Sequence, residues 1–191
     1  MIAVLDYGVG NLRNVARALR HLGADVAIAA APEAADRADR LILPGVGAFG
    51  ESIAQLRQRG LDRAVLAAIA AGRPVLGICV GFQLLFEESL EFGRHAGLGV
   101  IPGRIERFPE GVPVPHVGWN QVRWHGGPTR WYYFVHSYRA VGVPAGAVAG
   151  TAEYAGVFPA AVRKDRVWGV QFHPEKSQQA GLDLLRDFLA S

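Results

Sequence analysis

The sequence predicts an α/β fold: a mostly parallel central sheet with helices on both faces, plus an added antiparallel β portion. Two observations carry this prediction. Up to Glu91, short and almost continuously apolar runs alternate with segments whose apolar residues recur at helical spacing. Strands buried on both faces and their covering helices have this pattern. After Glu91, prolines and glycines break the chain into short β-rich pieces, as in antiparallel strands added to one edge or side of a sheet.

In the first half of the chain, strands are expected at residues 2–5, 24–29, 41–43 and 74–78. Asn11 has the side chain of a good helix N-cap, and apolar residues at helical spacing follow it until Gly23. Two further helical faces begin at Phe49 and Leu61. From Phe82 onward, a mixture of apolar and polar residues predicts another helix, packed against the sheet.

In the second half, β-rich pieces are expected around residues 114–124, 132–135 and 147–154. Residues 160–163 and 167–172 are expected to form a hairpin that turns at Lys164 and Asp165. Apolar residues between Leu182 and Leu189 predict a closing helix. No repeat, low-complexity tract or linker divides the chain, so residues 1–191 are expected to form one domain.

The turn Gly77-Ile78-Cys79-Val80-Gly81 has the Gly-x-nucleophile-x-Gly pattern and lies between an expected strand and an expected helix. Glycines at both ends remove the Cβ atoms that would clash in so tight a turn. The turn would aim the Cys79 sulfur along a helix N-terminus, where unpaired N–H groups and the helix dipole favour a thiolate. A lone Cys is more often a small buried apolar side chain, so Cys79 alone leaves both interpretations open.

His173-Pro174-Glu175 follows the expected strand at 167–172. Pro174 biases His173 away from the helical region, so the imidazole can point off the strand end. Both strand ends are expected at the carboxyl edge of the parallel sheet, where open α/β folds place their sites. A Cys nucleophile needs a base, and the base needs an orienting acceptor. The three residues together therefore indicate a Cys79–His173–Glu175 triad, although His173 or Glu175 alone would be an ordinary surface residue.

The loop at residues 44–50 matches Gly-x-Gly-x-x-Gly after a strand, a pattern typical of nucleotide sites. The acidic residue that should follow about 20 residues on is missing, which disfavours this interpretation. The alternative is that the loop presents backbone N–H groups to an oxyanion beside Cys79. No His, Cys or carboxylate pair has the spacing of metal ligands, so no metal and no cofactor are expected.

Composition limits the classes of protein to which the chain can belong. Its net charge is only +3, without a basic run, which argues against nucleic acid as a partner. A single Cys excludes an internal disulfide and suits a reducing compartment. The N-terminus lacks a signal-peptide pattern, and the longest apolar run, residues 64–71, is too short to span a bilayer. We therefore expect a soluble cytoplasmic protein that binds no membrane.

The two motifs Gly-Ile-Cys-Val-Gly-Phe-Gln at 77–83 and Gln-Phe-His-Pro-Glu-Lys-Ser at 171–177 resemble those of class I, triad-type glutamine amidotransferases. Within that group the chain resembles the glutaminase subunits of imidazole glycerol phosphate synthase. The supporting stretches are residues 6–13, 44–49, 97–103, 115–120 and 133–138, which cover the chain from end to end. Val80 and Phe82 depart from the usual Leu and Met, both by apolar exchange. The resemblance implies a flavodoxin-like fold.

The resemblance also implies an activity, which is glutamine hydrolysis through a thioester on Cys79 with His173 as base and Glu175 as orienter. It implies two oxyanion donors, the backbone N–H groups of Val46 and Val80. The residues implied to bind the amino-acid end of glutamine are Gly47, Gln83, Ser137 and Tyr138. The flanking glycines would let the Gly45–Val46 peptide rotate.

A separate cyclase subunit with a (β/α)₈ barrel is the implied partner, in a heterodimer. It would receive the ammonia through a dry passage and make imidazole glycerol phosphate and an aminoimidazole carboxamide ribotide, in histidine biosynthesis. Interface residues are expected in the loop at 7–14 and around Trp119, which by residue type is equally a candidate for the core. The candidates are Asn11, Asn14, Trp119, Tyr133 and Lys176.

Two other functions remain compatible with these residues. One is a Cys peptidase or γ-glutamyl hydrolase that applies the same triad to a larger substrate. The other is a catalytically silent sensor domain, which the intact Cys79, His173 and Glu175 disfavour. Trp119 and Lys176 favour a docked subunit over a free hydrolase.

Overall fold

The structure, a computed structural model, describes all residues from 1 to 191 and contains a nine-stranded main sheet. In spatial order its strands are β2 (Val26–Ala29), β1 (Ile2–Leu5), β3 (Arg40–Gly45), β4 (Val75–Cys79), β13 (Val167–Val170), β12 (Val157–Lys164), β11 (Val148–Glu153), β8 (His116–Trp124) and β9 (Arg130–His136). The strands from β2 to β13 pair in parallel, and those from β13 to β9 pair antiparallel. This confirms the predicted fold class, because the antiparallel portion continues one edge of the parallel sheet.

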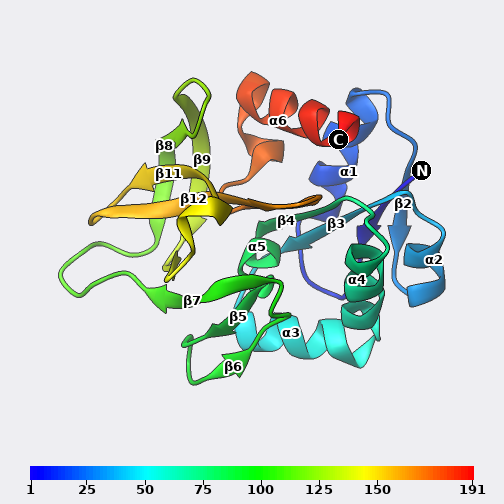
Figure 1. Cartoon of the computed structure of the whole chain (residues 1–191), viewed down its shortest axis with the longest axis horizontal. Helices are drawn as coiled ribbons and strands as arrows, with labels where there is room; N and C mark the ends of the chain where they lie inside the picture. Colours follow the sequence, from blue (N-terminus) through cyan, green and yellow to red (C-terminus); the bar gives the residue numbers. More distant parts are fainter.

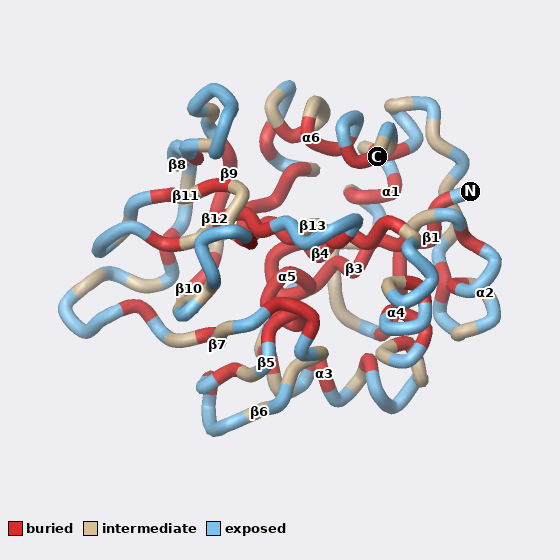
Figure 2. Tube along the Cα trace, in the orientation of Figure 1, coloured by how far each residue is buried: buried red, intermediate tan, exposed pale blue.

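Helices cover both faces of the parallel half (Figure 1). They are α1 (Leu12–His21), α2 (Pro32–Asp36), α3 (Phe49–Gln58), α4 (Leu61–Ala70), α5 (Val80–Leu84) and α6 (Gln178–Ala190), with short 3₁₀ helices η1 (Ala145–Ala147) and η2 (Pro174–Lys176). Helices α1 and α6 lie on one face, and α3, α4 and α5 lie on the other (Figure 1). None of the helices combines the length and the apolar character needed to cross a bilayer. Buried residues run along β1, β3 and β4, as expected for strands covered on both sides (Figure 2).

A second sheet of four short strands lies beside α3 and α5 (Figure 1). In spatial order they are β10 (Tyr138–Val141), β7 (Ile101–Arg107), β5 (Phe86–Ser89) and β6 (His95–Ala96). The sequence-based expectation that the helix from Phe82 continues through Phe86 is wrong. Helix α5 ends at Leu84 because Phe86–Ser89 pairs with β7, and this tertiary pairing overrides the local helical pattern.

Strand register brings distant segments to the carboxyl edge of the parallel sheet. Gly45 at the end of β3 pairs with Cys79 at the end of β4. On the other side of β4, Val170 of β13 pairs with Ile78, so the chain after Val170 also emerges next to Cys79. The order of the strands therefore brings the loops after β3, β4 and β13 together around the Cys79 thiol.

Candidate active site

Cys79 lies in a strained turn between β4 and α5. Its backbone has φ +56° and ψ −111°, a left-handed conformation that L residues rarely adopt. The turn is possible because its flanking glycines have no side chain. A Cβ at Gly81 would lie 1.8 Å from the Leu43 carbonyl oxygen, and one at Gly77 would lie 2.6 Å from the Gly81 carbonyl oxygen. Cys79 is 4% exposed and lines a small cavity at the sheet edge.

His173 and Glu175 form a buried pair on the chain segment after β13. The Nδ1 atom of His173 lies 2.8 Å from Oε1 of Glu175, and the two side chains are only 3% and 1% exposed. The amide of Asn11 donates a second hydrogen bond to the same carboxylate oxygen, at 3.3 Å. Asn11 precedes α1 as predicted, but its side chain makes no capping hydrogen bond, and its contact with Glu175 was not foreseen.

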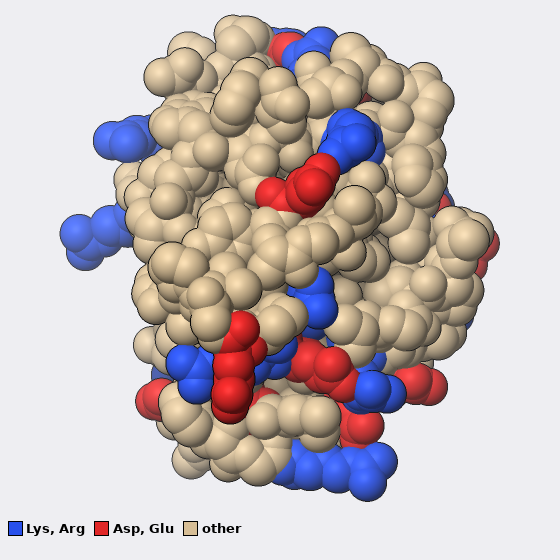
Figure 3. Space-filling model, turned by 90° about the vertical axis from the view of Figure 1, so that its left-hand side faces the viewer, with Lys and Arg blue, Asp and Glu red and all other residues tan.

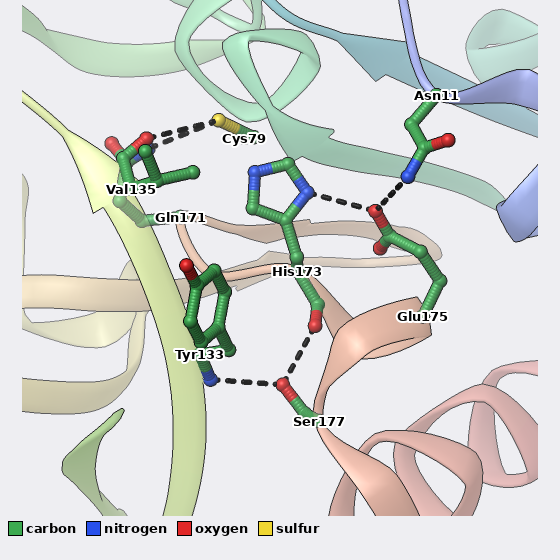
Figure 4. Close-up of polar contacts among 8 residues, drawn as sticks. All are labelled: Asn11, Cys79, Tyr133, Val135, Gln171, His173, Glu175 and Ser177. Carbon is green, nitrogen blue, oxygen red and sulfur yellow. Dashed lines mark hydrogen bonds and ion pairs between the residues drawn. The ribbon is translucent and has the colours of Figure 1, made fainter. Parts of the chain in front are cut away.

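The other ring nitrogen of His173 faces the thiol (Figure 4). Nε2 is buried and has no hydrogen-bond partner, while Cys79 lies on that side of the ring. Burial lowers the pKa of His173, but its interactions with Cys79 and Glu175 outweigh burial and raise the pKa to about 10. The imidazole can therefore hold a proton released by Cys79, as the base of a nucleophilic thiol must.

Two neighbouring groups hold the Cys79 sulfur and the adjacent side chains in place. Nε2 of Gln171 lies 3.9 Å from the sulfur, and the Val135 carbonyl lies at 4.0 Å. Oε1 of Gln171 also accepts a hydrogen bond of 3.0 Å from Nε2 of Gln83. Gln171 belongs to the motif at 171–177, but its type gave no indication that it would bridge Cys79 and Gln83.

The hydroxyl of Ser177 links the backbone of His173 to that of Tyr133 by hydrogen bonds. Oγ of Ser177 donates to the His173 carbonyl at 2.6 Å and accepts from the Tyr133 N–H at 3.0 Å (Figure 4). The His173 N–H in turn donates to the Tyr133 carbonyl at 2.9 Å. Sequence reasoning missed Ser177, whose nearness to β9 depends on the sheet order.

Ser177→Ala is expected to lower kcat by about tenfold with little change in KM. The reason is that the loss of two hydrogen bonds frees the His173 backbone without removing a group that touches substrate. Steady-state kinetics of the reaction at Cys79 would measure both constants. Ser177→Thr is the matched control, since it keeps the hydroxyl and should retain most of the activity. An alanine variant with wild-type kcat would show that β9 alone is enough to position His173.

The cavity at Cys79 has a volume of about 240 Å³, smaller than the pockets that hold drug-sized ligands. Its lining contains Cys79 and His173 together with all six of the residues expected at an oxyanion hole or substrate site: Val46, Gly47, Val80, Gln83, Ser137 and Tyr138. The Val46 N–H makes no hydrogen bond within the protein. A larger groove of about 720 Å³ lies between α6 and the antiparallel strands, but it contains none of the triad residues.

Glu91 is a cavity residue that sequence reasoning missed. Its carboxylate lies in the lining and accepts a hydrogen bond of 2.6 Å from the Phe49 N–H at the start of α3. Burial is the main cause of a raised pKa at Glu91. The cavity thus has a carboxylate that can attract a cationic group, and no sequence motif marked it.

Behind the site, Tyr7 packs under the loop that follows β3. Its hydroxyl donates to the Pro44 carbonyl, and its side chain is fully buried. Burial, followed by the charge of Cys79, raises the pKa of Tyr7. Tyr7 therefore supports the Gly45–Val46 segment from within, and it does not belong to the exposed surface expected of the loop at 7–14.

Three of the expected interface residues gather on the outer face of the β8–β9 hairpin. Trp119 is 44% exposed and packs edge-on against Tyr133, with 6.2 Å between ring centroids. The ammonium of Lys176 lies 5.6 Å from the centroid of the Tyr133 ring. Trp119 is thus a surface residue and not a core one. Asn14 is half-buried on α1, and Asn11 turns inward to Glu175.

The surface at this end of the molecule has few charges. Lys, Arg, Asp and Glu are sparse across the centre of the face in Figure 3 and gather toward its lower edge. Exposed apolar side chains on the outer face of the hairpin include Val117, at 56%, and Trp131, at 54%. An exposed aromatic and aliphatic face of this kind is typical of a protein–protein interface.

Together these groups can carry out acyl transfer. Cys79 can serve as a nucleophile, His173 as a base and Glu175 as an orienting carboxylate, and the backbone at Val46 and Val80 lines the same cavity as the thiol. The small cavity with a carboxylate at Glu91 suits a compact substrate with a cationic group.

Known proteins resemble the chain over its whole length. The family model described as "Glutamine amidotransferase class-I" matches residues 3–191. The protein named "Imidazole glycerol phosphate synthase subunit HisH" of Salinibacter ruber is 47% identical, with 100% of this chain and 94% of that protein covered. The protein of the same name from Exiguobacterium sibiricum is 48% identical, with 98% and 94% covered.

Solved structures agree on the fold. A structure titled "Crystal structure of glutamine amidotransferase" matches with a TM-score of 0.82 at 24% identity, covering 99% of this chain and 97% of that chain. "Structure of PurLQS from Thermotoga maritima" matches with a TM-score of 0.80 at 19% identity, covering 99% and 97%. At these identities the likeness is evidence for the fold alone.

Proposed function

Since this chain belongs to the class I glutamine amidotransferases and, among them, to the HisH subunits of imidazole glycerol phosphate synthase, we propose that it hydrolyses glutamine at Cys79 and passes the ammonia to a partner subunit. The chain is the glutaminase subunit of an enzyme of histidine biosynthesis. The observation that carries the residue assignment is that Cys79, His173 and Val46 line one cavity, with the buried Glu175 carboxylate paired to His173.

The proposed reaction begins when the Cys79 thiolate attacks the side-chain amide carbon of glutamine. The oxyanion that forms is held by the N–H groups of Val46 and Val80. His173, having taken the thiol proton, returns it to the leaving nitrogen, so ammonia departs and a thioester remains. Water, deprotonated by His173, then attacks the thioester, and glutamate leaves as the thiol is restored. Glu175 keeps the imidazole oriented throughout.

Substrate contacts in this proposal come from the rest of the lining. Gly47, Gln83 and the Ser137–Tyr138 backbone hold the amino-acid end of glutamine, and the Glu91 carboxylate attracts its ammonium group. Charge supports Glu91 in this role, because it is the one carboxylate in the lining.

The partner in this proposal is a cyclase subunit with a (β/α)₈ barrel, bound as a heterodimer in the cytoplasm. It docks on the exposed outer face of the β8–β9 hairpin, with Trp119, Tyr133 and Lys176 at the contact and Asn11 and Asn14 nearby. Tyr133 connects this face to the catalytic residues, because its backbone carbonyl accepts a hydrogen bond from the His173 N–H. Ammonia kept from bulk water stays unprotonated and therefore nucleophilic.

The proposed function predicts slow glutamine hydrolysis by the isolated chain and strong stimulation by the cyclase loaded with its ribotide. Glutamate release with and without the partner tests this directly. Lys176→Ala should weaken the stimulation more than it changes basal hydrolysis, because its ammonium lies on the docking face and off the catalytic cavity. Lys176→Arg, which keeps the charge over the Tyr133 ring, is the control and should retain more of the stimulation.

An isolated chain that already works at the full rate would refute coupling to the partner. A chain that releases no glutamate in either condition would refute the proposed activity itself.

A further inference from the structure

Two imidazoles meet at the edge of the catalytic cavity, and one of them, that of His136, belongs to a lining residue. His116 of β8 and His136 of β9 are opposite each other in the antiparallel ladder, and both are buried. Nδ1 of His116 lies 3.0 Å from Nε2 of His136. Four aromatic rings pack around the pair: Phe108, Phe134, Tyr154 and Phe158. The ring of His116 is stacked on both sides, 5.0 Å from Phe134 and 4.1 Å from Tyr154 between centroids.

The hydrogen bonds of this pair form a chain with one direction. Nδ1 of His136 lies 2.8 Å from the Tyr138 carbonyl, which can only accept, so Nδ1 carries the proton. Burial lowers the pKa of His136 to about 3, so the ring is neutral and its Nε2 accepts. Nδ1 of His116 must then be the donor. Burial also lowers the pKa of His116, and its Nε2 accepts from the Asn120 amide at 3.3 Å.

The group at the end of this chain belongs to the catalytic cavity. Strand β9 ends at His136 and β10 begins at Tyr138, so the chain crosses from the nine-stranded sheet to the four-stranded sheet here. At the crossing, the Tyr138 carbonyl accepts from His136 and, at 3.4 Å, from Nε2 of Gln83. Ser137 and Tyr138 line the same cavity as Cys79.

Packing alone does not require two imidazoles at this place. Phenyl rings would fill the space between the four aromatic side chains without burying polar atoms, and replacing both partners of a buried hydrogen bond by apolar groups of like shape is nearly neutral. A phenyl ring, however, cannot donate a hydrogen bond to the Tyr138 carbonyl, as the Nδ1 of His136 does. The best explanation of the pair is therefore its hydrogen bond to the Tyr138 carbonyl. A buried network in which every polar group is bonded holds its members in one position, and here it holds that carbonyl.

We propose that His116 and His136 are positioning residues of the glutaminase reaction: acting as a relay anchored at Asn120, they hold the Tyr138 carbonyl and so set the shape of the substrate cavity. Neither is a catalytic residue in this role: His136 lines the cavity, but the proposed effect of both histidines passes through the Tyr138 carbonyl. The proposal rests on the proposed function, in that the affected substrate is glutamine.

Kinetics of the complex with its cyclase partner test the relay. His116→Phe keeps a ring stacked between Phe134 and Tyr154 but removes the donor to His136, which leaves the His136 ring free to change tautomer and release Tyr138. The KM for glutamine is expected to rise by about tenfold, with kcat nearly unchanged, as for the loss of one neutral hydrogen bond. An unchanged KM, or a fall in kcat alone, would overturn the proposal.

A matched pair of variants at His136 separates donation from packing. His136→Asn can donate to the Tyr138 carbonyl from nearly the same position as Nδ1, whereas His136→Phe cannot donate at all. The asparagine variant should therefore show a KM closer to that of the wild type. Equal KM values in the two variants would contradict the relay.

The tautomers give a readout that does not depend on activity. Nitrogen NMR of the ¹⁵N-histidine-labelled complex at neutral pH should show both imidazoles protonated on Nδ1, which the relay requires and which is the minor form of free histidine. Protonation of either ring on Nε2 alone would refute the relay. A complex that never releases glutamate would refute the proposed function instead, while the tautomer result would still be decisive for the hydrogen-bond chain.

Discussion

Cys79→Ala is expected to abolish glutamine-dependent synthesis by the complex while synthesis from added ammonia continues. Without the sulfur no thioester forms, and removing one member of a catalytic triad lowers turnover by about 10⁴-fold or more. Added ammonia enters the reaction after that step and reaches the cyclase without the thiol. Product formation from glutamine and from an ammonium salt, measured on the same preparation, gives both rates.

The comparison also separates chemistry from folding. Cys79 is one of the buried residues of the main core, so a purely structural role predicts that both activities fall together. Alanine is smaller than cysteine, and Gly77 and Gly81 still allow the strained turn, so the variant should bind the partner as the wild type does. Cys79→Ser gives a second check, because it restores the shape but supplies a poor nucleophile. Glutamate release by either variant near the wild-type rate would place the nucleophile elsewhere.

Val46→Pro is expected to lower stimulated glutamine hydrolysis by about 10²–10³-fold, the usual cost of one lost oxyanion donor. Proline removes the backbone N–H that makes no hydrogen bond within the protein, and the side chain of Val46 is already 38% exposed. Gly45, the residue before the new proline, has no Cβ to clash with its ring. Basal hydrolysis should fall much less, because the isolated chain depends less on a fully formed oxyanion hole.

Val46→Ala is the matched control, since it shortens the same side chain and keeps the N–H. It should be stimulated almost as strongly as the wild type. A fluorescence titration with the cyclase measures binding, which both variants should retain, and glutamate release measures turnover. If proline and alanine at this position gave the same stimulated rate, the second oxyanion donor would lie outside the loop after β3.

Patterns of a few neighbouring residues were enough to predict the two segments that contain the proposed catalytic residues, the turn at Cys79 and the segment 173–175. The turn at Cys79 could be predicted because its glycines and its nucleophile lie within five residues, where covalent geometry alone demands them. His173 and Glu175 could be paired because only Pro174 separates them in the chain. The strand–helix alternation of the first half fixed a parallel sheet, and a parallel sheet brings its strand ends to one edge.

The helix expected beyond Phe82 shows where local pattern fails. Apolar residues at positions 84–86 suit a helix as well as a strand, and the choice was made by β7, which pairs with Phe86–Ser89. Trp119 was equally ambiguous, because residue type does not say which face of a strand a side chain occupies. The register with Tyr133 decides it and places both rings on the outer face.

By itself, then, the sequence predicted the fold class, and two local motifs, at 77–81 and 173–175, predicted the residues of the proposed triad. The tertiary structure alone decided which distant groups support them. Gln171 reaches Cys79 across 92 positions because β13 and β4 are adjacent in the sheet. Asn11 reaches Glu175 across 164 positions because the start of α1 lies against η2, although β1 and β13 are separated by two other strands. The His116–His136 relay arose in the same way, because a cross-strand pair exists only once the register of two strands is set.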